Sequence, residues 1–476
     1  MIKEDADTIC AIATATGRGG IGIVRLSGPE ALAIGQRITG LTLQPRLATF
    51  VDMMSSNCEL IDSGIALYFK APHSFTGENV VELQGHGGPQ VLQSLLEQCI
   101  ARGARVAAPG EFTERAFLNG KIDLLQAEAI ADLIDASSAQ AARSAMRTLK
   151  GVFSEKIHQL VEDITRIRVN VETAIDFTDE DIDIMTDTGV AEAMETASQR
   201  LTDVFEAAHQ GLVVKDGITV VLVGAPNAGK SSLLNALAGT DTAIVTDIPG
   251  TTRDVIRQEI NLNGLPVHII DTAGMRDSED VVEREGVKRA VSALDEADLI
   301  LLVADSAVYS DQEPGPVLQT LFAGKYGDTA IDEATHLTEL AQLLNRVCVV
   351  YNKIDLTECH EPGVSSTHYQ DHVLKLFRLS AKTRTGLDDL RDHLSELAGY
   401  QSSGEGNFSA RERHLTALSN AQESLESAIS GVCEHLPLEL VAEDLRRVQT
   451  FLGAITGEVS SDDLLGEIFS NFCIGK

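Results

Sequence analysis

The stretch Gly224-Ala225-Pro226-Asn227-Ala228-Gly229-Lys230-Ser231 constrains the fold of this chain more than any other feature. It follows an apolar run, 218–223, and precedes a helix-like segment, 232–237. Glycines at this spacing let the backbone curl, so that consecutive N–H groups and a helix N-terminus face one anion. Lys230 can then reach β- and γ-phosphates, and Ser231 can offer its hydroxyl to Mg²⁺. The stretch therefore predicts a phosphate-binding loop, although by itself it could also be a glycine-rich packing turn.

Three further motifs follow in the order expected of a guanine-nucleotide domain. Asp271-Thr272-Ala273-Gly274 comes after an apolar strand end, where a carboxylate can help to hold the metal ion. Asn352-Lys353-Ile354-Asp355 and Ser380-Ala381-Lys382 also come directly after apolar runs. The two carboxylate oxygens of Asp355 can accept the N1–H and N2–H₂ donors of guanine, which adenine lacks. Each motif alone could be a polar turn, but the four together predict a guanine-nucleotide site.

The segment Thr246-Asp247-Ile248-Pro249-Gly250-Thr251-Thr252 lies between the first two motifs and is typical of a switch loop. The Thr252 hydroxyl can complete the Mg²⁺ shell when a γ-phosphate is present, so the loop would be released on hydrolysis. The residues predicted to contact the nucleotide are Asn227, Ala228, Gly229, Lys230, Ser231, Ser232, Thr246, Asp247, Ile248, Pro249, Gly250, Thr251, Thr252, Asp271, Thr272, Ala273, Gly274, Asn352, Lys353, Asp355, Ser380, Ala381 and Lys382.

Met275 stands where Ras-like GTPases carry the glutamine that orients the attacking water. A thioether cannot perform that task, so another group nearby must hold the water. The candidates in the charged segment that follows are Arg276, Glu279, Asp280, Glu283 and Glu285. The alternative is that most of these charges form the solvated start of a helix.

The switch segment, together with Asn227, resembles that of potassium-dependent GTPases, and the final Phe472-Cys473-Ile474-Gly475-Lys476 resembles the MnmE (TrmE) family of tRNA-modifying GTPases. The resemblance runs from end to end. Other long strings that carry it are Gly17-Arg18-Gly19-Gly20-Ile21-Gly22, Gly85-His86-Gly87-Gly88-Pro89, Pro109-Gly110-Glu111-Phe112-Thr113 and Ile130-Ala131-Asp132-Leu133-Ile134-Asp135-Ala136. The family places its catalytic glutamate at Glu283. The oxygen ligands expected for K⁺ are those of Asn227, Thr246, Ile248 and Thr251.

For residues 1–120 the resemblance implies a folate-binding domain, similar to the aminomethyltransferase of the glycine cleavage system, that also mediates homodimerisation. The folate would be a tetrahydrofolate derivative in the 5,10-methylene or 5-formyl form. The family's folate contacts fall on Arg25, Glu82, Lys121 and Lys476. A carboxylate can accept hydrogen bonds from a pterin edge, and cations suit the glutamate tail. Without the resemblance, each of these residues would be taken for a surface charge.

Cys473 stands four residues from the end of the chain, as in a prenylation box. The following Ile-Gly-Lys lacks the second aliphatic residue and a usual last residue, so lipidation is not expected. A thiol on a C-terminal tail beside a cofactor can act as a nucleophile or as an acid/base. The alternative is a residue that only packs.

The composition points to a cytoplasmic enzyme with no membrane segment. No apolar run approaches the ~18 residues of a spanning helix, the N-terminus lacks the order of a signal peptide, and seven cysteines without a Cys-x-x-Cys pair suggest a reducing compartment. The net charge of −33 opposes a general affinity for tRNA, so a partner or a local basic patch would have to hold the RNA. The acidic segment 176–187 is either a solvated loop or a dock for a basic partner.

The spacing of apolar residues predicts a multidomain chain with an α+β N-terminal folate-binding-like domain, an all-α helical domain and an inserted α/β P-loop Ras-like GTPase domain. The predicted boundaries are 1–120, 121–214 and 400–476 for the first domain and the two helical parts, and 215–399 for the GTPase domain. Helical stripes are predicted for Leu160, Ile164, Ile167 and Val171; for Leu124, Ala127, Ala131 and Ile134; for Leu418, Ala421, Leu425, Ala428 and Val432; and for Val441, Leu445, Val448, Leu452 and Ile455.

Taken together, these features predict a homodimeric GTPase that depends on K⁺ and Mg²⁺. As the resemblance implies, it would act with the FAD/NADH-dependent partner MnmG, in a heterotetramer or larger complex. The pair would add an aminomethyl or carboxymethylaminomethyl group to C5 of the wobble uridine of certain tRNAs, using a folate one-carbon unit. Two alternatives stay open: a GTP-gated ribosome-assembly switch, and a folate aminomethyltransferase that is only regulated by GTP.

Overall fold

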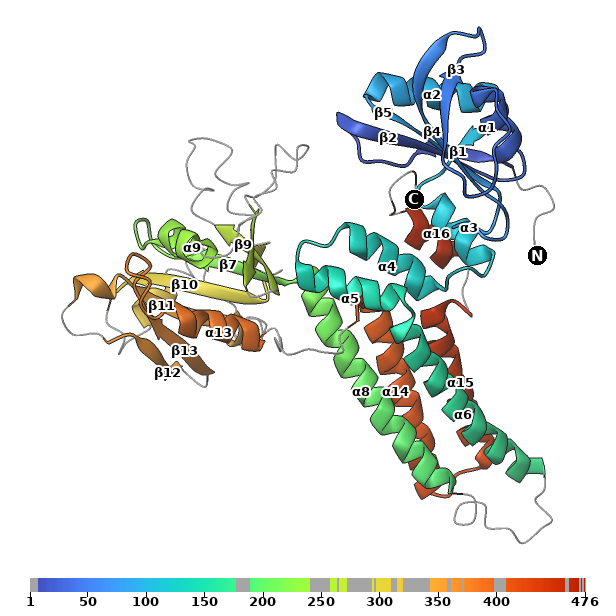
Figure 1. The fold of residues 1–476 in the computed structure, drawn as a ribbon. Helices are drawn as coiled ribbons and strands as arrows, with labels where there is room; N and C mark the ends of the chain where they lie inside the picture. The colour runs from blue at the N-terminus through green and yellow to red at the C-terminus, as the bar shows by residue number, and fades with distance from the viewer. Residues whose placement is uncertain are drawn as a thin grey trace, which may run out of the picture. The chain divides into compact units, whose positions relative to one another are not determined.

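The chain forms two compact units (Figure 1), which comprise Met1–Ile134, Met146–Val204 and Thr416–Lys476 in one and Asp135–Ala145 and Phe205–Leu415 in the other. The computed structural model describes residues 7–176, 189–239, 257–262, 265–271, 293–294, 297–309, 315–319, 343–357, 361–369, 372–397, 408–458, 462–470, 472 and 475. The four predicted domain ranges stay predictions.

The N-terminal part of the first unit is a six-stranded sheet in the order β3-β4-β5-β2-β1-β6. The strands are β1 (Ile9–Ile12), β2 (Gly19–Ser27), β3 (Thr49–Met54), β4 (Leu60–Phe69), β5 (Val80–Gly87) and β6 (Arg105–Val106). Helices α1 (Ala31–Thr39) and α2 (Pro89–Ala101) share a buried apolar cluster with one face of this sheet. Because side chains alternate along a strand, the partners Arg25, Glu82 and Leu67 lie together on the other face.

That second face is covered at one end and open at the other. Phe112, from α3 (Glu111–Leu118), packs with Ile9 and Ala11 of β1. At the β3–β4 end the paired residues Phe50 and Ile65 are exposed to 73% and 38%.

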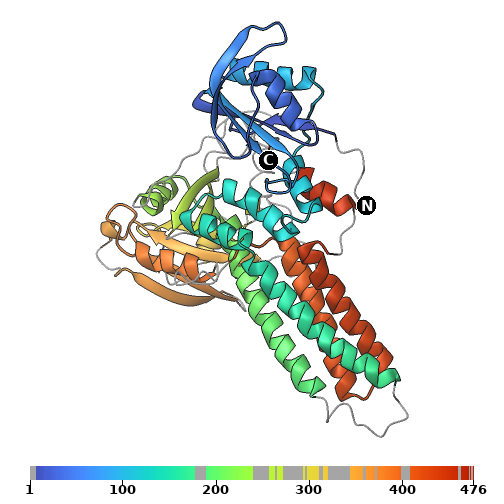
Figure 2. The same ribbon diagram turned by 45° about the vertical axis from the view of Figure 1, so that its right-hand side comes forward.

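The remaining helices of the chain's helical part range from 9 to 27 residues in length. Their bounds are α4 (Leu124–Ile134), α5 (Ala139–Leu149), α6 (Val152–Asp176), α8 (Val190–Asp216), α14 (Glu412–Cys433), α15 (Leu438–Thr456) and α16 (Asp462–Ser470). In both Figure 1 and Figure 2, α6, α8, α14 and α15 run side by side as a bundle. The apolar stripes predicted on α6, α14 and α15 are buried at every position. This burial is expected when apolar residues recur with the helical period and one face of the helix is covered.

The stripe predicted on α4 is only partly correct. Leu124 and Ala127 are buried, but Ala131 is only half-buried and Ile134 is 46% exposed. Ile134 is the last residue of α4, so the face of the helix that is buried at its start does not extend to its end. Asp132 takes the buried position near this end instead.

The second unit contains a seven-stranded sheet in the order β12-β13-β11-β10-β7-β9-β8. Its central strands run parallel, and the outer pairs β8–β9 and β12–β13 are antiparallel. Its strands are β7 (Ile218–Val223), β8 (Arg257–Leu262), β9 (Leu265–Asp271), β10 (Leu299–Asp305), β11 (Val347–Asn352), β12 (Gly363–Tyr369) and β13 (His372–Arg378). Every residue of β11 is buried, as in a parallel sheet covered on both faces.

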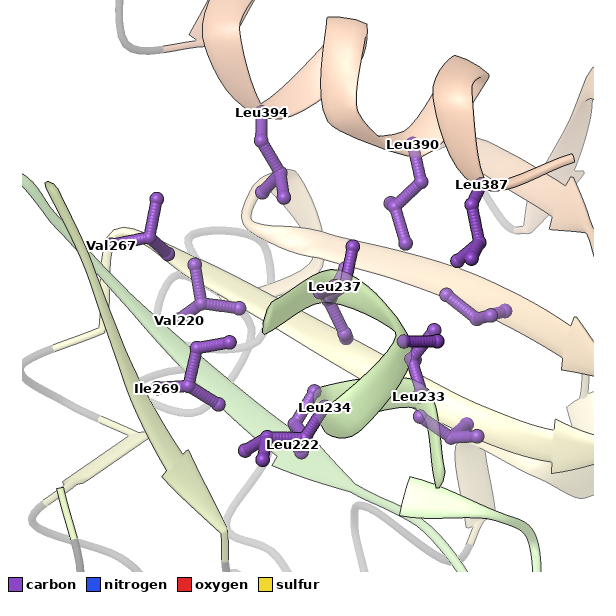
Figure 3. Packing of buried hydrophobic residues seen from close by; sticks show 14 of the residues in the cluster. Val220, Leu222, Leu233, Leu234, Leu237, Val267, Ile269, Leu387, Leu390 and Leu394 are labelled. Atoms are coloured by element: carbon purple, nitrogen blue, oxygen red, sulfur yellow. The ribbon is translucent and has the colours of Figure 1, made fainter. Parts of the chain in front are cut away.

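Figure 3 shows one of the two cores of this unit, where leucines of α9 (Lys230–Ala238) and α13 (Leu387–Leu397) pack onto the sheet. Leu233 and Leu237 come from α9, Leu390 and Leu394 come from α13, and Val220 belongs to β7. A second apolar cluster includes residues of the same strands that point the other way, such as Val221 and Leu302. Because the central strands run parallel, their carboxyl ends lie at one edge of the sheet. Ligands bind at this edge in sheets of this kind.

Across the part of the chain that the structure describes, no helix combines the length and the apolar character of a membrane-spanning segment.

Candidate functional site

The loop after β7 has the backbone that a phosphate site needs. Gly224 has φ of 153°, and a Cβ atom there would lie 2.1 Å from the Val303 carbonyl oxygen of β10. Gly229 has φ of 94°, and a Cβ atom there would lie 2.3 Å from Nδ2 of Asn352. Both positions require glycine because the backbone is left-handed and closely packed. The loop thus leads directly into α9, whose N-terminus favours an anion.

Lys230, the first residue of α9, is buried and reaches back over this loop. Its Nζ donates hydrogen bonds to the carbonyl oxygens of Gly224, at 2.9 Å, and Ala225, at 3.0 Å. Ser231 and Ser232 follow and are exposed at the start of the helix. Lys230 and Ser231 therefore lie where the phosphate loop meets α9, and their contacts with a phosphate and a Mg²⁺ ion stay predictions.

Asn352, at the carboxyl end of β11, joins three of the predicted motifs. It is 1% exposed. Its Nδ2 donates to the carbonyl oxygens of Ala228, at 3.2 Å, and Gly229, at 3.4 Å. Its Oδ1 accepts the backbone N–H groups of Lys353, at 2.8 Å, and Ala381, at 3.0 Å. One buried amide thus fixes the phosphate loop relative to both loops predicted to hold the base.

Lys353 supports the same loop from outside. Its Nζ donates to the Asn227 carbonyl oxygen at 2.6 Å and to Oδ2 of Asp305 at 2.7 Å. The hydrogen bond from Lys353 lowers the pKa of the Asp305 carboxyl below its ordinary value. Asp305 was not among the sequence predictions. The signal that could have found it is its place directly after the buried run of β10.

Asp355 and the loop after β13 meet, as the sequence predicted. Oδ1 of Asp355 accepts the Ser380 hydroxyl at 2.6 Å. The Ser380 Oγ in turn accepts the Thr383 N–H at 3.2 Å, and Ala381 is bound to Asn352. Asp355 and Lys382 are exposed, whereas Ser380 is fully buried. A carboxylate oriented by one serine keeps acceptor positions for the two donors of a guanine edge.

The other nucleotide predictions lie outside the described residues. These are the switch residues Thr246, Asp247, Ile248, Pro249, Gly250, Thr251 and Thr252, and Thr272, Ala273, Gly274, Arg276 and Glu283. Asp271 ends β9 at the same sheet edge as the phosphate loop, but its side chain also lies outside the description.

A second site of interest lies in the N-terminal domain. Arg25 pairs with Glu82 across β2 and β5, with 3.0 Å between Nε and Oε1 and 2.9 Å between Nη2 and Oε1. The Arg25 guanidinium carbon lies 6.0 Å from the ring centre of Phe75 and 5.8 Å from that of Phe112. Lys121, the third predicted folate residue, lines a pocket together with Phe75. The sheet therefore brings together cationic, acidic and aromatic groups that suit a heteroaromatic ligand.

The C-terminal tail approaches the same domain. Phe472 packs beside Gly110, next to α3, and lies 5.4 Å from the ring centre of Phe469. A Cβ atom on Gly475 would lie 2.3 Å from the Ile12 carbonyl oxygen in β1, which neighbours the strand of Arg25. Cys473 and Lys476 themselves lie outside the described residues.

Comparison with known proteins identifies the family of this chain. Residues 8–121 match the family model described as "GTP-binding protein TrmE N-terminus", and residues 124–473 match the one described as "MnmE helical domain". The protein named tRNA modification GTPase MnmE from Saccharophagus degradans is 50% identical to this chain, over 100% of both chains. The protein of the same name from Pseudomonas fluorescens (strain Pf0-1) is also 50% identical to it, over 99% of both chains. The chain belongs to the MnmE (TrmE) family. The predicted family, the three-part fold class and the enzyme class, a GTP hydrolase of tRNA modification, are confirmed.

Solved structures similar to this MnmE chain include the G domain of the T. maritima FeoB iron transporter, which is 26% identical and covers 38% of this chain and 98% of that chain, with a TM-score of 0.25. Another is Aquifex aeolicus Era bound to GDP·AlF₄⁻, 25% identical, covering 44% of this chain and 66% of that chain, also with a TM-score of 0.25. Because both TM-scores are low, these two structures carry no argument about the fold of this chain.

The geometry at Asp355 predicts the base preference of this MnmE-family protein. We expect Asp355→Asn to weaken GTP binding by a factor of ~10² or more, because the carboxylate that accepts both guanine donors is lost. We also expect the variant to gain affinity for xanthosine triphosphate, whose C2 carbonyl can accept from the new amide. Titration with both nucleotides measures this exchange. Asp389→Asn, at an exposed position of α13, is the matched control. Unchanged GTP affinity in Asp355→Asn would contradict the assignment.

Proposed function

We propose that this MnmE-family chain couples GTP hydrolysis to modification of the wobble uridine of certain tRNAs. It would act as a homodimer in the cytoplasm, depend on K⁺ and Mg²⁺, and work with MnmG to add an aminomethyl or carboxymethylaminomethyl group to C5. The observation that carries the nucleotide part is the network around Asn352, which links the phosphate loop to both base loops. The Arg25–Glu82 pair on the N-terminal sheet supports the folate part.

In the nucleotide site, the buried Lys230 would bind the β- and γ-phosphates, and Ser231 and Thr252 would hold Mg²⁺. Asn227 lies exposed in the left-handed conformation beside this loop, with φ of 65°. With Thr246, Ile248 and Thr251 it would offer oxygen atoms to a K⁺ ion. Such an ion supplies positive charge where other GTPases receive an arginine finger. Glu283 would orient the attacking water, with Arg276 as the next candidate.

In the folate site, Glu82 would accept hydrogen bonds from the pterin edge of a tetrahydrofolate derivative, and Lys121 and Lys476 would face its glutamate tail. Phe472 and Gly475, on either side of Cys473, pack against the N-terminal domain. This supports a position for the Cys473 thiol near the cofactor. The thiol would serve the one-carbon step, and hydrolysis of GTP would drive the conformational cycle.

The exposed Phe50 and Ile65 of the N-terminal sheet support homodimerisation, since a second copy would cover them. With a net charge of −33, the chain would bind tRNA weakly alone. This supports a complex in which MnmG supplies a basic surface for the RNA.

The first prediction of this proposal concerns the monovalent ion. We expect K⁺ to accelerate GTP hydrolysis by ~10² or more over Na⁺, since charge at this position is worth up to ~10³–10⁵ in rate. Asn227→Gly should lose this acceleration, because glycine accepts the left-handed backbone but supplies no side-chain oxygen. Steady-state hydrolysis in each salt measures it, with GDP affinity as the control for an intact loop. Equal turnover of the wild type in K⁺ and Na⁺ would remove the ion from the mechanism.

The second prediction concerns the attacking water. Glu283→Ala should lower kcat by about 10²-fold and leave GTP affinity nearly unchanged, as expected for an interaction made in the transition state. Single-turnover hydrolysis and nucleotide titration separate the two effects. Glu285→Ala, in the same charged segment, is the matched control and should hydrolyse GTP normally. Wild-type turnover by Glu283→Ala would shift the role to Arg276 or another neighbour.

The third prediction tests the function as a whole. A strain that lacks this protein should lose the C5 modification of its wobble uridines, and the wild-type gene should restore it. Cys473→Ser should not restore it and should still hydrolyse GTP, because a serine hydroxyl is a poor nucleophile without an adjacent base. The control Cys433→Ser changes an exposed thiol of α14. Nucleoside analysis of the strain's tRNA gives the result. Normal uridines in the deletion strain would reject the function, and full restoration by Cys473→Ser would reject the role of the thiol.

A further inference from the structure

We propose that Arg46, His73 and Lys121 form a subsite for the carboxylates of a polyglutamate tail, so that this protein binds folates with several glutamates more tightly than those with one. The inference rests on the proposed folate function and concerns the part of the ligand beyond the pterin. It adds Arg46 and His73 to the residues expected at that site.

The subsite is an open pocket of about 660 Å³ on the second face of the N-terminal sheet. Leu67 of β4 and Phe75 form apolar walls, and Arg46, His73 and Lys121 supply polar groups. A pocket with apolar walls and a few convergent polar groups is the usual form of a small-molecule site.

The two permanent cations of the pocket have no acidic partner among the described residues. Arg46 donates from Nη2 to the His73 carbonyl oxygen at 3.3 Å, and Lys121 donates from Nζ to the Pro72 carbonyl oxygen at 3.1 Å. Neither forms an ion pair with a described carboxylate, although acidic residues outnumber basic ones by 71 to 38 in the whole chain. Cations left unpaired around a concavity in so acidic a protein favour an anionic ligand.

The pocket lies beside the Arg25–Glu82 pair. Leu67 lies opposite Glu82 in the sheet, and Glu82 lies opposite Arg25, so the three side chains share one face. Phe75 lines the pocket and also stands 6.0 Å from the Arg25 guanidinium. One end of the combined site thus offers the paired charges of Arg25 and Glu82 and an aromatic ring, and the other end offers cations without a described acidic partner. This polarity fits a ligand with a donor-bearing heteroaromatic head and an anionic tail.

The position of Arg46 is imposed by its surroundings. Its φ is 60°, an unfavourable value for a residue other than glycine, and its N–H donates to the Tyr68 carbonyl oxygen at 2.8 Å. Such conformations persist where the neighbouring structure fixes them, and they cluster at ligand sites. The opposite rim is fixed too, since Asn119 donates from Nδ2 to the Thr76 carbonyl oxygen at 2.7 Å. The backbone at both rims of the pocket is therefore fixed before any ligand binds.

A nucleic-acid backbone fits this surface less well. RNA binding needs cations that follow a run of phosphates, whereas the sheet face that carries this pocket also carries the carboxylate of Glu82. The cations form a local pocket beside that acidic group, which favours a small ligand.

The test compares 5-formyltetrahydrofolate with one and with three glutamates, titrated into the full-length protein by calorimetry at low salt. The wild type should bind the triglutamate about five- to tenfold more tightly, as expected of one or two additional, partly exposed charge pairs. Arg46→Gln should remove most of this difference in affinity. Its affinity for the monoglutamate should stay within about twofold of the wild-type value, and this retained binding shows that the domain is folded. Arg46→Lys should keep part of the preference. The matched control is Arg37→Gln, an exposed cation of α1, which packs on the other face of the sheet.

Three results would overturn the inference. Equal affinity of the wild type for both folates would reject the tail subsite and leave the folate function standing. A preference that survives Arg46→Gln would show that other groups bind the tail, and a simultaneous loss of tRNA binding in that variant would assign the cations to RNA. If neither folate binds the wild type, the proposed folate function fails together with the inference.

Discussion

The buried amide of Asn352 is the interaction on which the nucleotide site depends. It donates to two carbonyl oxygens of the phosphate loop and accepts N–H groups from the two loops expected to hold the base. A side chain with both donors and an acceptor can satisfy all of these groups, whereas aspartate could not donate and leucine could not bond at all. Because Asn352 is 1% exposed, losing either half of this network would leave buried polar groups unpaired.

The sheet makes this arrangement possible. β7, β10 and β11 run parallel and are buried on both faces, so their carboxyl ends lie side by side. The phosphate loop follows β7, Asp305 ends β10, and Asn352 ends β11. Lys353 then connects Asp305 to the phosphate loop through two hydrogen bonds. The rigid apolar strands thus hold short polar loops in a fixed relation, which is what pre-organised phosphate binding needs.

Charge is distributed very unevenly in this chain. The net charge of the chain is −33, yet Lys230, Arg46 and Lys121 lie at sites expected to take anions, and Arg25 lies beside one of them. Local geometry decides their role. Lys230 is buried against backbone carbonyls and Arg25 is paired with Glu82, while Arg46 and Lys121 bond only to carbonyl oxygens among the described residues. Cations of this last kind are free to exchange those contacts for a carboxylate.

The sequence by itself determined the apolar strands that precede the four nucleotide motifs, the order of those motifs and most helical stripes. Local spacing decides these features: the glycines at 224 and 229 predict a curled loop, and the burial of Leu445 or Ile164 follows from a period of 3.6. Only the tertiary structure decided which polar groups meet. The partners Lys353 and Asp305 are 48 residues apart and Arg25 and Glu82 are 57 apart, so no local pattern pairs them. The exposure of Ile134 likewise depends on where the surface that covers α4 ends. The helical period of the sequence gives no information about that end point.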